Sequence, residues 1–135
     1  MLTGKFDLRT SARSEMLDLT AQVSAWLRQN GAREGMLTLY CPHTTGALTI
    51  NEGYDPDVCG DMLSTLERLV PKDPHYRHAE GNSDSHVKAT LVGASVRVPV
   101  REGAPQLGRW QAIFFCEFDG PRRREVELCF EGAAR

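Results

Sequence analysis

Residues 109–119 read Arg-Trp-Gln-Ala-Ile-Phe-Phe-Cys-Glu-Phe-Asp, and this segment is the most informative one for the fold class. Its centre is apolar on both alternating faces: Ile113 and Phe115 lie on one face, and Phe114 and Cys116 lie on the other. A strand that is apolar on both faces must be covered on both sides. The stretch therefore predicts the central strand of a layered domain.

Further strands flank this stretch in the C-terminal third of the chain. Valine alternates with arginine and proline over residues 96–101. After the turn at Asp119-Gly120-Pro121, large apolar residues again occupy every second position over residues 126–130. Additional strand signals are found at residues 2–9, 36–41 and 47–50. Strands grouped in hairpins, with few helices between them, predict an α+β fold.

The helical signals lie in the first two thirds of the chain. An apolar stripe predicts one helix from about Ser14 to the Asn30-Gly31 pair, which suits a helix C-terminus. A second stripe predicts a helix from about Asp55 to Leu69, with Pro56 in its first turn. Its members are Val58, Met62, Leu66 and Leu69. A short third helix is predicted over residues 83–91, and without linkers or repeats we expect a single domain over residues 1–135.

Composition narrows the classes of function. The 135 residues include 16 Lys+Arg and 18 Asp+Glu, and this net charge of −2 argues against a nucleic-acid-binding protein. No apolar run approaches the roughly 18 residues that a membrane span requires. We therefore expect a cytoplasmic protein with no membrane or nucleic-acid partner. The four cysteines form no Cys-x-x-Cys pair, which argues against a disulfide framework and a thiolate zinc site.

Histidines gather in two places. His43 follows an expected strand, whereas His75, His78 and His86 lie in a polar stretch. Glu80, Asn82 and Asp84 lie between the last two of these histidines. Imidazoles near carboxylates are typical of a zinc site or another divalent-metal site. Histidines on a solvent-exposed loop would give the same pattern, so spacing alone leaves both interpretations open.

Polar residues also collect where the expected strands end. Asn51 and Glu52 follow a strand directly and precede a helix, a position that suits the wall of a cleft. Asp55 and Asp57 fit the same cleft, or they stabilise the helix N-terminus as a cap and a first-turn carboxylate.

The end of the central strand carries a further polar group. Gln111 and Glu117 share one face of that strand, and three consecutive arginines follow the next turn. The arginines are either a solvated turn or an anion site, because guanidinium groups match phosphate oxygens. Arg122 is the candidate we favour for anion binding, and Lys88 is a weaker one.

Four segments together resemble the YjbQ family: residues 42–52, 55–57, 76–89 and 110–122. They follow the family's order over nearly the whole chain, with a departure at Arg109, where many members carry a small hydroxyl residue. The resemblance implies a single-domain antiparallel β-sandwich with helices packed outside. It also implies a ring-shaped homotrimer with sites near the subunit interfaces.

The resemblance further implies a function. Family members are described as secondary thiamine-phosphate synthases, which couple a hydroxymethylpyrimidine diphosphate to a thiazole phosphate and release pyrophosphate. The implied catalytic residues are Glu52, Glu117, Asn51 and Gln111, and the implied metal ligands are His43, His78 and His86. For a small phosphorylated substrate, the resemblance adds Asn82, Asp84 and Asp57 to Arg122 and Lys88, which are candidates by their charge. The metal would be divalent, with zinc expected and magnesium as the alternative.

Two other functions remain open at this point: a non-catalytic trimer that binds metal or a small anion, and a metal-dependent hydrolase. Glu52, Glu117 and Arg122 lie where apolar alternation breaks off. We therefore expect their replacement to affect turnover rather than folding.

Overall fold

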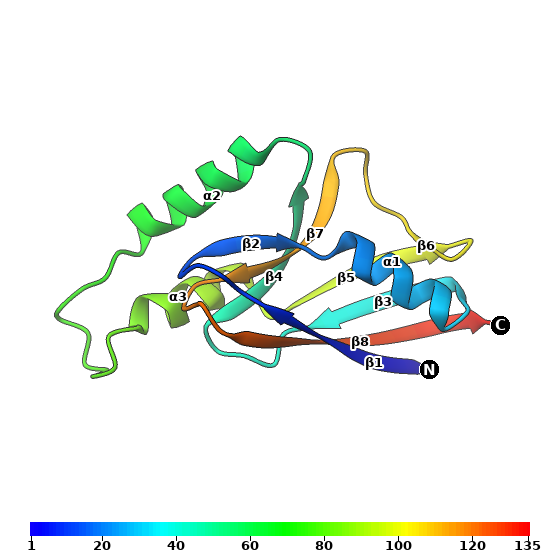
Figure 1. Cartoon of the computed structure of the whole chain (residues 1–135), viewed down its shortest axis with the longest axis horizontal. Helices are drawn as coiled ribbons and strands as arrows, with labels where there is room; N and C mark the ends of the chain where they lie inside the picture. Colours follow the sequence, from blue (N-terminus) through cyan, green and yellow to red (C-terminus); the bar gives the residue numbers. More distant parts are fainter.

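The computed structural model describes residues 1–135 and contains three helices and eight strands (Figure 1). The strands are β1 (Leu2–Arg9), β2 (Glu15–Asp18), β3 (Ala32–Tyr40), β4 (Gly46–Glu52), β5 (Ser95–Arg101), β6 (Ala104–Pro105), β7 (Gln111–Glu117) and β8 (Arg123–Ala134). The helices are α1 (Thr20–Gln29), α2 (Pro56–Leu69) and α3 (Ser83–Val92).

The strands form two antiparallel sheets that pack face to face. The larger sheet has the order β1-β8-β3-β5-β6, and the smaller has the order β2-β7-β4. Side chains from both sheets, such as Leu37 and Val126 from the larger and Phe115 from the smaller, share one buried cluster that also includes residues of α1. The predicted α+β sandwich is confirmed at this level.

Strand β7 is the centre of the smaller sheet and is covered on both faces, as its sequence predicts. Ile113 and Phe115 point into the cluster between the sheets, whereas Cys116 packs in a second cluster with Phe118. Partly buried side chains of α2 and α3, such as Leu63, cover this second cluster. The chain's own helices therefore cover the second face, without help from another subunit.

The expected helix from about Ser14 is wrong in its first turn. Glu15–Asp18 form strand β2 instead, with Met16 opposite Cys116, and α1 begins only at Thr20. The residues are amphipathic enough for a helix, but pairing along the edge of β7 prevails over local periodicity. The structure also extends β3 back to Ala32.

Helix α2 begins as its sequence predicts, because the Asp55 carboxylate accepts a hydrogen bond from the Asp57 backbone N–H and Pro56 occupies the first position. The apolar stripe of α2 is less buried than its sequence pattern suggests. No residue of α2 is fully buried, and Leu69 is 69% exposed. Helix α2 lies at the outer margin of the molecule (Figure 1).

None of the three helices combines the length and the hydropathy that a bilayer-spanning helix requires. All four cysteines are free thiols, and Cys41 and Cys116 are buried among apolar side chains. Burial raises the pKa of Cys116 to about 12, so this thiol stays protonated.

Candidate functional site

The paired strands β4 and β7 separate the candidate residues into two groups. Gly46 lies opposite Glu117 at one end of the pair, and Glu52 lies opposite Gln111 at the other. At a strand rise of about 3.4 Å per residue, these ends are about 20 Å apart. We call the end at Gly46 the histidine end and the end at Glu52 the amide end.

A single chain therefore does not bring all the predicted residues together. The histidine end holds His43, His78, Asn82, Asp84, His86, Lys88, Glu117 and Arg122. The amide end holds Asn51, Glu52, Asp57 and Gln111.

Glu117 and Arg124 form a buried ion pair at the histidine end, with side-chain exposures of 0% and 3%. Arg124 Nε donates to Glu117 Oε1 at 2.8 Å, and Arg124 Nη2 donates to Oε2. The Thr10 hydroxyl donates to Oε1 at 2.8 Å, and the backbone N–H groups of Phe118 and Asp119 donate to Oε2. Every lone-pair direction of this carboxylate is thus used inside the protein.

Burial alone would raise the pKa of Glu117, but the hydrogen bonds from Arg124, the Asp119 backbone and Thr10 outweigh it and leave the pKa below its ordinary value. Glu117 is therefore a buried, charged structural group and is poorly suited to move a proton. From the sequence we expect its replacement to affect turnover rather than folding, but this strand end is buried, so the structure predicts an effect on folding instead.

The same ion pair fixes His43. Arg124 Nη2 donates to Thr45 Oγ1 at 2.8 Å, and the backbone N–H of the next residue, Glu125, donates to His43 Nε2 at 2.9 Å. Burial, followed by the positive charge of Arg124, lowers the pKa of His43. His43 is therefore neutral at pH 7, and its Nε2 acts as an acceptor.

A cavity of about 440 Å³ lies beside His43. His43 and Thr44 line it from the loop before β4, and His86 and Thr90 line it from α3. The rings of His86 and His78 meet edge to face, with centroids 5.6 Å apart.

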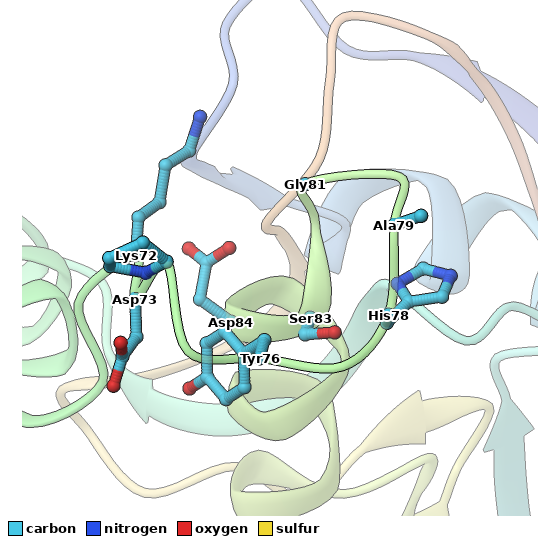
Figure 2. A pocket seen from close by; sticks show the side chains of 9 residues that line it. Lys72, Asp73, Tyr76, His78, Ala79, Gly81, Ser83 and Asp84 are labelled. Atoms are coloured by element: carbon cyan, nitrogen blue, oxygen red, sulfur yellow. The ribbon is translucent and has the colours of Figure 1, made fainter.

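His78 in turn lines a second cavity of about 480 Å³. Figure 2 shows the chain between α2 and α3 curving around this cavity, with Lys72 on one side and His78 on the other. Tyr76 and Ser83 add hydroxyl groups to its wall. The pair of histidines therefore lies between two polar cavities.

Asp84 also lines the second cavity, but its charge is neutralised by two cations. Arg13 Nη2 lies 3.1 Å from Asp84 Oδ1, and Lys88 Nζ lies 3.1 Å from Oδ2. Lys88 is only 1% exposed and also contacts Glu67 Oε2 at 2.5 Å. Burial would raise the pKa of Asp84, and the hydrogen bonds from Lys88 and Arg13 lower it overall. The prediction that Lys88 binds a substrate anion is wrong for this conformation, because both of its contacts are carboxylates within the chain.

Asn82, Asp119 and Arg122 form a partly exposed cluster near the start of α3. Asn82 Nδ2 donates to Asp119 Oδ2 at 2.8 Å, and Arg122 Nη2 lies 3.0 Å from the same oxygen. Asn82 Oδ1 is buried and has no hydrogen-bond partner. The Arg122 side chain is 50% exposed, so its remaining N–H groups can reach a ligand.

At the amide end, the candidate side chains already shape their own turns. Glu52 Oε2 accepts from the backbone N–H groups of Tyr54 and Asp55 at 2.7 and 2.9 Å. Asn51 and Gln111 use their side-chain oxygens for the N–H groups of neighbouring residues, which leaves both amide NH₂ groups free. Asp57 is an exposed first-turn residue of α2.

The residues needed for a metal centre are only partly assembled. No group of three or more histidine, cysteine, aspartate or glutamate side chains is arranged to hold a metal ion. His78 and His86 lie together, but His43 Nε2 is already occupied by the Glu125 N–H. His75 pairs with Asp73 and lies outside the group, as expected. The residues of one chain therefore do not form a complete zinc site.

Sequence reasoning missed Arg124, Thr10 and Thr45. A signal for Arg124 was present, because it falls in phase with the inward-facing residues of β8 and so had to point into the core. The two threonines carry no comparable signal.

It also missed an aromatic cluster at the amide end. The rings of Tyr54 and Trp110 meet edge to face at 5.1 Å, and the guanidinium of Arg109 lies 4.7 Å from the Trp110 ring centre. Arg109 is the residue at which we expect, from the sequence, a departure from the family pattern.

Comparison with known proteins identifies the family of this chain. The sequence matches the family described as UPF0047 protein YjbQ-like over residues 4–133. The chain belongs to the YjbQ family. UPF0047 protein YugU of Bacillus subtilis is 48% identical over 126 residues, which cover 93% of this chain and 96% of the relative. A UPF0047 protein of Methanocaldococcus jannaschii is 45% identical over 121 residues, covering 90% of this chain and 88% of the relative.

Solved structures agree with this membership. A YjbQ/UPF0047 family protein from Clostridium acetobutylicum aligns with a TM-score of 0.91 and 42% identity, covering 94% of this chain and 98% of that chain. A hypothetical protein from Aeropyrum pernix gives 0.93 and 37%, covering 98% of this YjbQ-family chain and all of the other (100%). The resemblance predicted from the sequence is thus confirmed, and so is the fold of a single chain.

We predict that Glu117→Gln lowers the free energy of unfolding by roughly 3–5 kcal/mol, because it leaves Arg124 buried without a counter-charge. Because the pKa of Glu117 is lowered in the folded state, its contribution is present above the unfolded-state value of about 4.3 and is lost as the pH falls below it. The variant should therefore lose less stability in acid than wild type does.

Denaturant unfolding between pH 7 and pH 3 measures both effects. Glu127→Gln is the matched control, since Glu127 lies on the exposed face of the same strand that carries Arg124. Equal stability of Glu117→Gln and the control at pH 7 would contradict a structural role for the pair.

Proposed function

We propose that this chain is a transferase acting on a phosphorylated substrate, with secondary thiamine-phosphate synthase activity as the specific reaction. In that reaction a hydroxymethylpyrimidine diphosphate joins a thiazole phosphate, and pyrophosphate leaves. The observation that carries the proposal is the polar cavity of about 480 Å³ at the start of α3.

The wall of this cavity suits phosphate oxygens. Lys72 supplies a positive charge, Tyr76 and Ser83 supply hydroxyl donors, and His78 supplies a ring nitrogen. The cavity lies at the N-terminus of α3, where no side chain caps the first backbone N–H groups. Free N–H groups and the helix dipole at such an end favour an anion. Asp73 also lines the wall and would oppose an anion, so the cationic groups have to outweigh it.

The residues of the chain would act mainly by binding and charge stabilisation. As the bond between the pyrimidine methylene carbon and the diphosphate oxygen breaks, negative charge grows on the leaving pyrophosphate. Lys72 and the free N–H groups of half-exposed Arg122 could stabilise that charge. Glu52 keeps one carboxylate oxygen free of chain contacts. Within one chain it lies at the opposite end of the β4–β7 pair, so it could take part in proton transfer at this cavity only from a neighbouring subunit.

We predict that Lys72→Ala and Arg122→Ala each weaken the binding of inorganic pyrophosphate by about 10- to 100-fold, the usual cost of losing a hydrogen bond to a charged group. Calorimetric titration gives the affinity, and a coupling assay with both thiamine precursors gives the activity. Lys5→Ala is the control, because Lys5 pairs with Glu125 on the exposed face of the larger sheet.

Binding of pyrophosphate without any coupling activity would favour the non-catalytic anion-binding trimer. No binding by wild type would contradict both functions.

We also propose that His78 and His86 are the residues that would hold a divalent ion, most simply zinc, with further ligands from outside this pair. The support is their edge-to-face contact and the chemistry of imidazole nitrogen. No catalytic step depends on this ion in the mechanism above.

We expect His86→Ala to purify with much less zinc than wild type, whereas His75→Ala keeps it, because the His75 ring pairs with Asp73 and lines neither cavity. Elemental analysis of the purified proteins measures the difference. Equal metal content in the two variants would argue against the assignment.

We further propose that the chain assembles as a homotrimer in which the amide end of one subunit meets the histidine end of the next. The separation of the two groups of family residues within one chain supports this arrangement. So does the exposure of large side chains at the amide end, where Tyr54 and Trp110 are 78% and 47% exposed. Tyrosine, tryptophan and arginine are the side chains that most often anchor an interface.

Sedimentation at micromolar concentration should report a mass of about three chains, and Trp110→Ala should shift the equilibrium toward monomer because it removes such an anchor. Arg101→Ala serves as a control, since Arg101 is an exposed residue of β5 in the larger sheet, whereas the amide end belongs to β4 and β7 of the smaller sheet. A wild-type monomer would contradict the trimer and with it any site shared between subunits.

A further inference from the structure

We propose that His43 is a fixed N–H donor toward a phosphoryl oxygen in the cavity that it shares with His86, and that it is not a metal ligand. The identity of the acceptor as a phosphoryl oxygen rests on the proposed function, whereas the donor role and the exclusion from metal binding rest on the hydrogen bonds of His43 alone.

The first step is the tautomer. His43 Nε2 lies 2.9 Å from the Glu125 backbone nitrogen, whose N–H can only donate. Nε2 must therefore present its lone pair. A neutral imidazole carries one ring proton, and that proton has to sit on Nδ1. His43 thus offers an N–H from Nδ1, and the lone pair on Nε2 is already used by the Glu125 N–H.

The second step is access. No group of the chain accepts a hydrogen bond from His43 Nδ1, and the only buried side-chain atom without a partner is Asn82 Oδ1. Nδ1 is therefore reachable from outside the protein. Because the ring lines the cavity of about 440 Å³, a ligand there can accept this N–H. Thr44 and Thr90 provide hydroxyl groups in the same wall.

The third step is rigidity. Arg124 binds Thr45 two residues after His43 and is itself held by Glu117, and the N–H that fixes the ring belongs to the residue after Arg124. The ring and its anchor are therefore tied to one buried ion pair. A donor held in place before the ligand arrives loses little entropy on binding, so it stabilises developing charge more effectively than a mobile one.

The same geometry works against metal binding. A histidine binds zinc through an unprotonated nitrogen. Zinc could reach Nε2 of His43 only if the bond from Glu125 broke, and Nδ1 carries the proton. The family pattern groups His43 with His78 and His86, but the hydrogen bonds separate their roles.

Long-range ¹H–¹⁵N spectra of histidine-labelled protein at pH 7 test the tautomer and the metal directly. We expect His43 to show a protonated Nδ1 and an acceptor-type Nε2, and added zinc to perturb His78 or His86 but not His43. A proton on Nε2, or a zinc-dependent shift of both His43 nitrogens, would overturn the proposal.

Two variants of His43 distinguish the donor role of Nδ1 from the acceptor role of Nε2. An asparagine amide lies near the position of Nδ1, and a glutamine amide reaches that of Nε2. With inorganic phosphate as the probe for the His43 cavity, His43→Asn should keep the affinity within about threefold of wild type, whereas His43→Gln should lose about fivefold or more, the usual effect of one neutral hydrogen bond. Equal losses in the two variants would contradict the donor role.

Thr45→Val and Thr45→Ser form a matched pair that leaves His43 unchanged. Valine removes the acceptor for Arg124 and should alter the His43 ring signals, and serine should restore them. Unaltered signals in Thr45→Val would contradict the rigidity argument. If wild type binds no pyrophosphate, the proposed function fails, and the spectra still decide the role of His43 independently.

Discussion

The buried ion pair between Glu117 and Arg124 joins segments that are far apart in the sequence. Glu117 ends β7, Arg124 is the second residue of β8, and their hydrogen bonds reach Thr10 after β1 and Thr45 before β4. Taking two charges out of water is expensive, so the pair is stable only because nearly all its polar atoms are satisfied. The loop that carries His43 and the turn that carries Asp119 and Arg122 both take their positions from it.

The core strand and the helix caps were predictable because each depends on local pattern. Double-sided apolarity identified β7, and Asp55 with Pro56 marked the start of α2. Strand β2 was not predictable, because its four residues owe their conformation to pairing with β7 rather than to their own periodicity. For the same reason β3 extends further back than its apolar residues suggest.

The candidate site was predictable as a set of residues but not as an arrangement. Motifs pointed to His43, His78 and His86, yet only the structure shows that the backbone of Glu125 occupies His43. Charge suggested Arg122 as the favoured anion ligand and Lys88 as a weaker one. Burial separates them, because Lys88 is enclosed with two carboxylates and Arg122 is half exposed. The sequence carries little information on which charged residues form ion pairs with each other inside the folded chain.

Helix α2 differs from the rest of the chain in how it is attached. It buries no residue completely, and one ion pair from Glu67 to Lys88 and a few partly buried leucines connect it to the sandwich. Local opening costs free energy in proportion to the contacts it breaks, so helix α2 of a single chain should open without unfolding the sheets. Its amide hydrogens should consequently exchange with solvent far sooner than those of β7, and a protease should find its first cleavage sites there.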